Sequence, residues 1–129
     1  MEPENAILVF VVDDDVAILH STRFFLECEG HAVVTFRDGP TLLAAFPGPS
    51  PDIVLLDHIM PGMDGLEVAA RLRDLDVRVP AVLITGHPDP AIRVRARAAG
   101  IPVVEKPLAC NALLGLLAAY GARRSAARD

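Results

Sequence analysis

Short apolar runs recur along the chain, and between them lie segments whose apolar residues have helical spacing. The runs are rich in valine, isoleucine and leucine, and they are continuous rather than alternating with polar residues. Continuous runs of this length predict strands that are buried on both faces, which is typical of a parallel sheet. The predicted strands are residues 6–12, 31–36, 52–57, 79–85 and 101–105.

The intervening segments predict helices at about 16–29, 40–46, 65–75, 90–99 and 109–120. Asp15 and Asp64 precede two of these helices and are the expected N-caps, and Gly30 is expected to end the first helix. Strands that alternate with helices of about ten residues predict right-handed βαβ units. The expected architecture is therefore α/β, a three-layer α/β/α sandwich around a five-stranded parallel sheet.

Four of the five predicted strands end on side chains capable of ionic chemistry. These are Asp13-Asp14-Asp15, Asp57, Thr85 and Lys106, the only lysine in the chain. All strands of a parallel sheet end at the same edge, where open α/β folds bind their ligands. We therefore expect these side chains to meet in one crevice.

Composition predicts one globular domain. The chain has 129 residues, of which 52% are hydrophobic and 22% charged. No apolar stretch approaches the ~20 residues of a membrane helix, and the acidic first residues are unlike a signal peptide. A cytoplasmic protein that does not bind membranes is expected. Cys28 and Cys110 lie outside any C-x-x-C pattern and are expected to be reduced packing residues.

The net charge of −5 is distributed unevenly. Residues 1–64 carry eleven acidic side chains and two arginines, whereas residues 65–129 carry ten basic and six acidic ones. This asymmetry indicates either two differently solvated faces, or a cation-attracting site early in the chain and a basic contact surface later. Arg93 and Arg97 are four residues apart in a predicted helix and can share a face, while Arg95 cannot join them.

Asp13, Asp14 and Asp57 would repel one another at one edge unless a cation compensated their charge. Mg²⁺ (or Mn²⁺) prefers such oxygen ligands. Asp57 could be a metal ligand, a nucleophile that forms an aspartyl phosphate, or both. Phosphoryl transfer also requires neutralisation of the phosphoryl oxygens, for which Lys106 and the Thr85 hydroxyl are available.

Four segments, in this order, closely resemble the receiver domain of bacterial two-component response regulators: VVDDD at 11–15, LLDHIMPGMDGLE at 55–67, LITG at 83–86 and EKP at 105–107. The resemblance covers about residues 6–120, and its D-x-x-MPGMDG segment is the most specific part. It implies a flavodoxin-like strand order 2-1-3-4-5. A receiver domain would span residues 1–122, followed by an arginine-rich tail at 123–129.

The resemblance also implies roles for single residues. Asp57 would accept a phosphoryl group from a histidine kinase or a histidine phosphotransfer protein. Asp14 and Asp57 would bind Mg²⁺ together with the backbone carbonyl of Ile59, and Asp13 would hold a metal-bound water. Lys106 would contact the phosphoryl oxygens.

The remaining implied roles concern the switch. The peptide bond before Pro107 would be cis. Thr85 would move to hydrogen-bond the phosphoryl group, and the small Gly86 would leave access to it. The implied function is a phosphorylation-dependent signalling switch. It would not be an enzyme in the usual sense, because it would catalyse only its own phosphorylation and slow dephosphorylation.

Three positions depart from the family pattern. Val103 stands where the family usually has an aromatic residue, so the usual coupling to output is not expected. His58 stands at a generally apolar position, where it is expected to be a polar-tolerant rim residue or, alternatively, a pH-sensitive modulator. Ile59 and His87 lie where the family tunes the lifetime of the phosphoryl group, and an apolar Ile59 favours a longer lifetime.

The family uses its fourth helix, fifth strand and fifth helix for output contacts. The candidate partner surface here consists of Arg93, Arg97, Arg123, Arg124 and Arg128. It would bind an unidentified output protein or, after phosphorylation, a second copy of the chain. Direct nucleic-acid binding is not expected, because the domain is acidic and no recognition helix follows.

Two alternatives remain open. Residues 13–16 also satisfy the strand-end motif of haloacid-dehalogenase-type phosphatases, in which Asp13 would be the nucleophile. That family needs a further acidic pair and a larger chain, and it leaves MPGMDG unexplained. The chain could also be the receiver of a hybrid kinase or a DNA-binding regulator, although Met1 and the arginine-rich tail suit a stand-alone protein.

Overall fold

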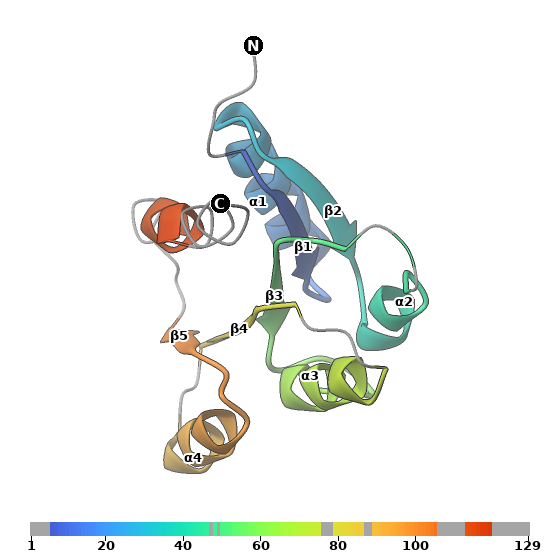
Figure 1. The fold of residues 1–129 in the computed structure, drawn as a ribbon, viewed down its shortest axis with the longest axis vertical. Helices are drawn as coiled ribbons and strands as arrows, with labels where there is room; N and C mark the ends of the chain where they lie inside the picture. The colour runs from blue at the N-terminus through green and yellow to red at the C-terminus, as the bar shows by residue number, and fades with distance from the viewer. Residues whose placement is uncertain are drawn as a thin grey trace, which may run out of the picture.

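A five-stranded, all-parallel sheet organises the protein, with strand order β2-β1-β3-β4-β5 (Figure 1). The computed structural model describes residues 6–46, 48, 50–75, 79–86, 89–105 and 113–119. The elements are β1 (Leu8–Val12), α1 (Val16–Cys28), β2 (Ala32–Phe36), α2 (Gly39–Leu43), β3 (Ile53–Asp57), α3 (Gly65–Asp74), β4 (Ala81–Thr85), α4 (Pro90–Ala98), β5 (Val103–Glu105) and a helix over residues 113–119. The predicted fold class and strand order are confirmed.

Both faces of the sheet are covered, which explains why the apolar runs are continuous. Neighbouring residues of a strand point to opposite faces. In β1, Phe10 and Val12 belong to the core formed with α2, α3 and α4, whereas Val9 and Val11 belong to the core formed with α1 and helix 113–119. Figure 1 shows α1 and helix 113–119 on one side of the sheet and the other three helices on the opposite side.

Every strand begins one or two residues later than predicted. At several of these starts, side chains or prolines stand where further ladder bonds would form. The Asp52 carboxylate accepts a hydrogen bond from the Leu8 N–H (2.8 Å), and His31 Nδ1 accepts one from the Ile7 N–H (3.2 Å). Pro80 and Pro102 precede β4 and β5 and have no N–H to donate, although their carbonyls accept hydrogen bonds.

The predicted starts of the helices at 16, 65 and 90 are confirmed; α2 begins at Gly39, one residue earlier than predicted, and residue 109 lies outside the described residues. The Asp15 carboxylate accepts hydrogen bonds from the Ala17 and Ile18 N–H groups. Asp64 and Glu67 form a reciprocal capping box at the start of α3. The Gly30 backbone adopts a φ of 93° just after α1, a conformation that favours glycine.

Two expectations for this part of the chain are wrong. Helix α2 ends at Leu43 rather than at Phe46, because the Ala45 and Phe46 N–H groups donate to the carbonyls three residues back, in the pattern of a tighter turn. The Phe46 ring still packs near Phe10, with centroids 6.1 Å apart. Cys28 is exposed and unpaired instead of packing inside, because it faces outward at the last turn of α1; Cys110 lies outside the described residues.

Candidate functional site

The strand register aligns the predicted site residues along one edge of the sheet. Val12 pairs with Leu56, so Asp13 and Asp57, the residues that follow, come at the same level. Asp57 itself pairs with Ile84, the residue before Thr85. The carboxyl ends of β1, β3 and β4 therefore meet, as the sequence predicts.

Three carboxylates cluster at this edge. Oxygen atoms of Asp13, Asp14 and Asp57 all lie within 4.8 Å of one another. Asp13 and Asp57 are only 4% and 8% exposed, whereas Asp14 is exposed. Carboxylates this close repel one another, and a hard divalent cation with oxygen ligands compensates for this. Within the described part of the chain, no other group of acidic, histidine or cysteine side chains has such spacing.

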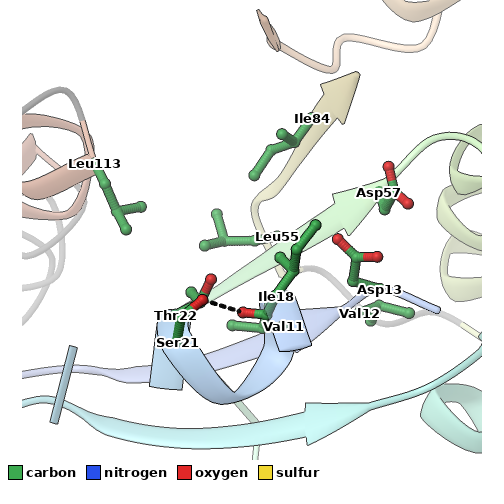
Figure 2. A pocket seen from close by; sticks show the side chains of 10 residues that line it. All are labelled: Val11, Val12, Asp13, Ile18, Ser21, Thr22, Leu55, Asp57, Ile84 and Leu113. Carbon is green, nitrogen blue, oxygen red and sulfur yellow. Dashed lines mark hydrogen bonds between the residues drawn. The ribbon is translucent and has the colours of Figure 1, made fainter. Parts of the chain in front are cut away.

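The Asp13 side chain is held by the turn between β1 and α1. The Oδ1 atom of Asp13 accepts a hydrogen bond from the Asp15 N–H (2.9 Å), and the backbone N–H of Asp13 donates to the Phe36 carbonyl (3.1 Å). Figure 2 shows the carboxyl groups of Asp13 and Asp57 pointing toward the same space. The acidic end of the site is therefore fixed by backbone contacts as well as by the strand register.

The other predicted site residues differ in exposure. Thr85 is fully buried at the end of β4, and Gly86 beyond it is exposed. Ile59, two residues after β3, has 57% of its surface exposed. Val103 is half-buried in β5. Several predicted positions lie outside the described residues, namely Lys106, Pro107, His87 and the tail 123–129. The predictions about them remain predictions.

His58 is not a rim residue, so that expectation is wrong. The residue is only 6% exposed, and its Nδ1 atom has no hydrogen-bond partner among the residues that the structure describes. The backbone explains the burial, because the His58 N–H continues the β3–β4 ladder by donating to the Ile84 carbonyl (3.0 Å). The alternative, that His58 is a pH-sensitive modulator, stays a prediction.

The arginines of α4 divide between two sides of the helix. Arg93 and Arg97 line a groove of about 390 Å³ between α4 and β5, together with Val103. Arg95 instead lies 4.0 Å from the Asp64 carboxylate at the start of α3. The prediction that Arg93 and Arg97 share a face without Arg95 is confirmed.

Sequence reasoning missed part of the wall next to the carboxylates. Ile18, Ser21 and Thr22 of α1 line a cavity that also contacts Asp13 and Asp57. Their spacing of three and four residues, on a helix that starts just after Asp15, is the signal by which they could have been found.

Comparison with protein-family models matches residues 9–118 to the response regulator receiver domain. The chain belongs to this family. As a receiver domain, it is similar to the transcriptional regulatory protein FixJ of Bradyrhizobium diazoefficiens, with 34% identity over 84% of this chain and 54% of FixJ. It is also similar to the response regulator MprA of a Mycobacterium species, with 36% identity over 91% of this chain and 51% of MprA. The chain thus spans about half the length of these curated relatives.

A CheY-like receiver domain from Methanospirillum hungatei has the same fold, with a TM-score of 0.85 and 26% identity over 93% of this chain and 97% of that one. A receiver domain is a module of two-component signalling whose switching depends on phosphorylation, and nothing in these comparisons supports a haloacid-dehalogenase-type phosphatase. None of the helices in the described ranges has the length and apolar character needed to cross a bilayer.

Proposed function

We propose that this receiver domain takes a phosphoryl group on Asp57 and thereby changes its binding to a partner. The observation that carries this proposal is the cluster of Asp13, Asp14 and Asp57 at the carboxyl edge of the sheet. Asp57 is the member of the cluster that ends β3 and opens the D-x-x-MPGMDG segment, within the region matched by the family model.

The proposed step is a displacement at phosphorus. An Asp57 carboxylate oxygen forms a bond to the phosphorus atom while the phosphorus–nitrogen bond of a phosphohistidine breaks, and the released imidazole takes up a proton from solvent. Such transfers depend on neutralising the phosphoryl oxygens and on in-line geometry. Mg²⁺, held by Asp13, Asp14, Asp57 and the Ile59 backbone carbonyl, would supply positive charge there. Lys106 and the Thr85 hydroxyl would bind the remaining phosphoryl oxygens.

The proposed response is a shift at the end of β4. Phosphorylation adds about −1.5 to −2 charge at the acidic edge. Thr85 is buried at that edge, and the exposed Gly86 follows it on the way to α4. A hydrogen bond from Thr85 to the phosphoryl group would therefore bias the position of the segment that leads to α4. The apolar side chain of Ile59 cannot orient an attacking water, so dephosphorylation would be slow.

The proposed partners follow from these features and from the family. The phosphoryl donor would be a histidine kinase or a histidine phosphotransfer protein, and the location would be cytoplasmic. The output partner, an unidentified protein or a second copy of the chain, would bind the surface of α4 and β5. Support comes from Arg93 and Arg97, whose exposed guanidinium groups flank the groove beside Val103.

Incubation with acetyl phosphate and Mg²⁺, followed by mass spectrometry of the intact protein, tests the proposal. We expect wild type to gain one phosphoryl group and Asp57→Asn to gain none. Asp74→Asn, at the exposed end of α3, is the matched control and should be phosphorylated like wild type. An adduct that persists in Asp57→Asn but disappears in Asp13→Asn would support the phosphatase alternative instead.

A further inference from the structure

The groove between α4 and β5 has two arginines on its helix side and apolar side chains on its sheet side. Its volume is about 390 Å³, and the exposed Arg93 and Arg97 line it from α4. Ile101, Pro102 and Val103, which lead into β5, form the other wall. Among the described residues that line the groove none is acidic, although the chain as a whole has a net charge of −5. Charge complementarity therefore favours an anionic partner in this groove.

Strand β5 also ends the sheet, so one of its backbone edges has no neighbouring strand in the part of the chain that the structure describes (Figure 1). The Pro102 carbonyl accepts a hydrogen bond from the Leu83 N–H (2.9 Å), and Val103 is paired with Leu83 in the register. Successive residues of a strand direct their N–H and carbonyl groups alternately to its two sides. Those of Val103 and Glu105 therefore face the open edge, which is a template for a further strand.

The two arginines have the spacing of alternate side chains in an extended segment. Arg93 and Arg97 are four residues apart in α4, which corresponds to a rise of about 6 Å along the helix. Two residues along a strand, the distance between side chains on the same face, correspond to about 6.6 Å. Because α4 connects two parallel strands, it runs back along β5, so the two spacings can be matched.

We propose that this groove binds an extended acidic segment of a partner protein, which adds to the sheet beside β5. The backbone of the segment would pair with the N–H and carbonyl of Val103. Two of its carboxylates, at alternate positions, would make charge-assisted hydrogen bonds to Arg93 and Arg97. Glu105 is exposed further along the same edge, so the segment would have no third carboxylate at that level.

Other anionic partners fit this groove less well. A cube of the same volume is only about 7 Å across, whereas a helix with its side chains is about 10–12 Å wide. The backbone groups of a helix are bonded internally and would leave the edge of β5 unpaired. A nucleic acid could bind the arginines but has no peptide backbone to continue the sheet. That the partner is the output protein rests on the proposed function, whereas binding of an acidic strand does not.

The test uses the full chain and two synthetic peptides of equal composition, without Mg²⁺ and without a phosphoryl donor. The probe, acetyl-Ser-Glu-Val-Glu-Val-Ser-amide, has its glutamates at alternate positions. The comparison peptide, acetyl-Ser-Glu-Glu-Val-Val-Ser-amide, has them adjacent, so that in a strand they point to opposite faces. In NMR titrations we expect the probe to bind at least about fivefold more tightly than the comparison peptide.

Substitution of the arginines tests the charge pairing. We expect the double variant Arg93→Gln/Arg97→Gln to weaken probe binding at least about tenfold, because both charge-assisted contacts are lost. Arg95→Gln is the matched control, since Arg95 lies on the other side of the same helix, toward Asp64. It should change probe affinity less than about twofold.

Amide hydrogen exchange tests the addition of a strand. When the probe is bound to wild type, the amides of Val103 and Glu105 should exchange at least about fivefold more slowly, because they become hydrogen-bonded. The Val33 amide is the control: it faces the open edge of β2, at the other end of the sheet, and its exchange should not change.

Three outcomes would overturn the acidic-strand site: equal binding of the two peptides, undiminished probe binding by the folded double variant, or unchanged exchange of Val103 and Glu105 in the complex. The first and third are measured on wild type and do not depend on a variant folding. A wild-type dimer in sedimentation that is lost in the double variant would also overturn it, because a second copy would then occupy the groove.

These results are separable from the proposed function. If the probe fails while acetyl phosphate still modifies Asp57, the acidic-strand site is wrong and the proposed function stands. If the probe binds as expected and Asp57 is not modified, the site stands and the proposed function is wrong.

Discussion

Asp57 lies opposite Ile84 in the parallel register of β3 and β4. The Ile84 carbonyl accepts a hydrogen bond from the His58 N–H (3.0 Å), so the backbone just after the candidate phosphoacceptor is held by the neighbouring strand. The same pairing puts Thr85 one position further along the edge. The distance between the candidate phosphoacceptor and the candidate switch residue is therefore set by the sheet rather than by a loop.

Neutralising Asp14 should stabilise the protein without metal and reduce its stabilisation by Mg²⁺. Asp14→Asn removes one of three clustered negative charges at an exposed position. Without Mg²⁺ we expect the free energy of unfolding to rise by about 1 kcal/mol, the energy of two unit charges about 4 Å apart in water. Urea denaturation with and without Mg²⁺ measures both effects. Equal stabilisation of Asp14→Asn and wild type by Mg²⁺ would contradict the metal site, and Asp74→Asn serves as the control.

Replacing His58 by leucine should stabilise the fold. His58 Nδ1 is buried without a hydrogen-bond partner within the described ranges. An unsatisfied buried polar group costs about 1–3 kcal/mol, and an apolar side chain of similar size avoids that cost. We expect His58→Leu to raise the free energy of unfolding by part of this amount. His20→Leu, exposed on α1, should change it by less than about 0.5 kcal/mol. A clear loss of stability in His58→Leu would refute this account.

Stability should decrease as the pH falls below 6.5. Burial lowers the pKa of His31 from its ordinary value of 6.5, and the negative charge of Glu29 opposes this only in part. The His31 Nδ1 atom accepts the Ile7 N–H bond, which a protonated ring cannot do. The unfolded chain therefore binds this proton more readily, so the contribution is complete above pH 6.5 and is lost as the pH falls toward the lowered pKa.

Urea denaturation of wild type and His31→Gln at about pH 7.5 and about pH 5.5 isolates this contribution. The decrease in stability between the two pH values should be smaller in His31→Gln. Asp38 does not interfere, because hydrogen bonds from Thr41 lower the pKa of this carboxyl from its ordinary 3.8. Identical pH dependence in the two proteins would show that the Ile7–His31 bond does not contribute.

Gly65 and Gly115 should respond to alanine in opposite directions. A Cβ at Gly65 would lie 2.5 Å from Leu83 Cδ1 and 2.8 Å from the Asp57 carbonyl oxygen. We expect Gly65→Ala to lower the free energy of unfolding by about 1–3 kcal/mol, since the Asp57 backbone is held in the sheet. A Cβ at Gly115 meets nothing within 4 Å, so Gly115→Ala should stabilise its helix by about 0.5–1 kcal/mol. Thermal denaturation of both variants checks the signs, and a stable Gly65→Ala would show that α3 can move away from β3.

The elements of this fold could be predicted because their signals are local. Asp15 and Asp64 each cap a helix by bonding to amides two or three residues away. The predicted strand starts are less accurate, because contacts near them come from residues distant in sequence. An example is the hydrogen bond from the Leu8 N–H to the Asp52 carboxylate. The strand order followed from the resemblance to a family rather than from periodicity.

The sequence by itself determined the alternation of strands and helices and the presence of ionic side chains at the strand ends. Hydrophobic period and capping act over a few residues, so both can be seen in one stretch of chain. Only the tertiary structure decided that His58 is buried, that Gly65 packs against the Asp57 backbone, and that a cavity separates Leu113 from the carboxylates. These features depend on how surfaces from distant segments fit together, and no local pattern records that fit.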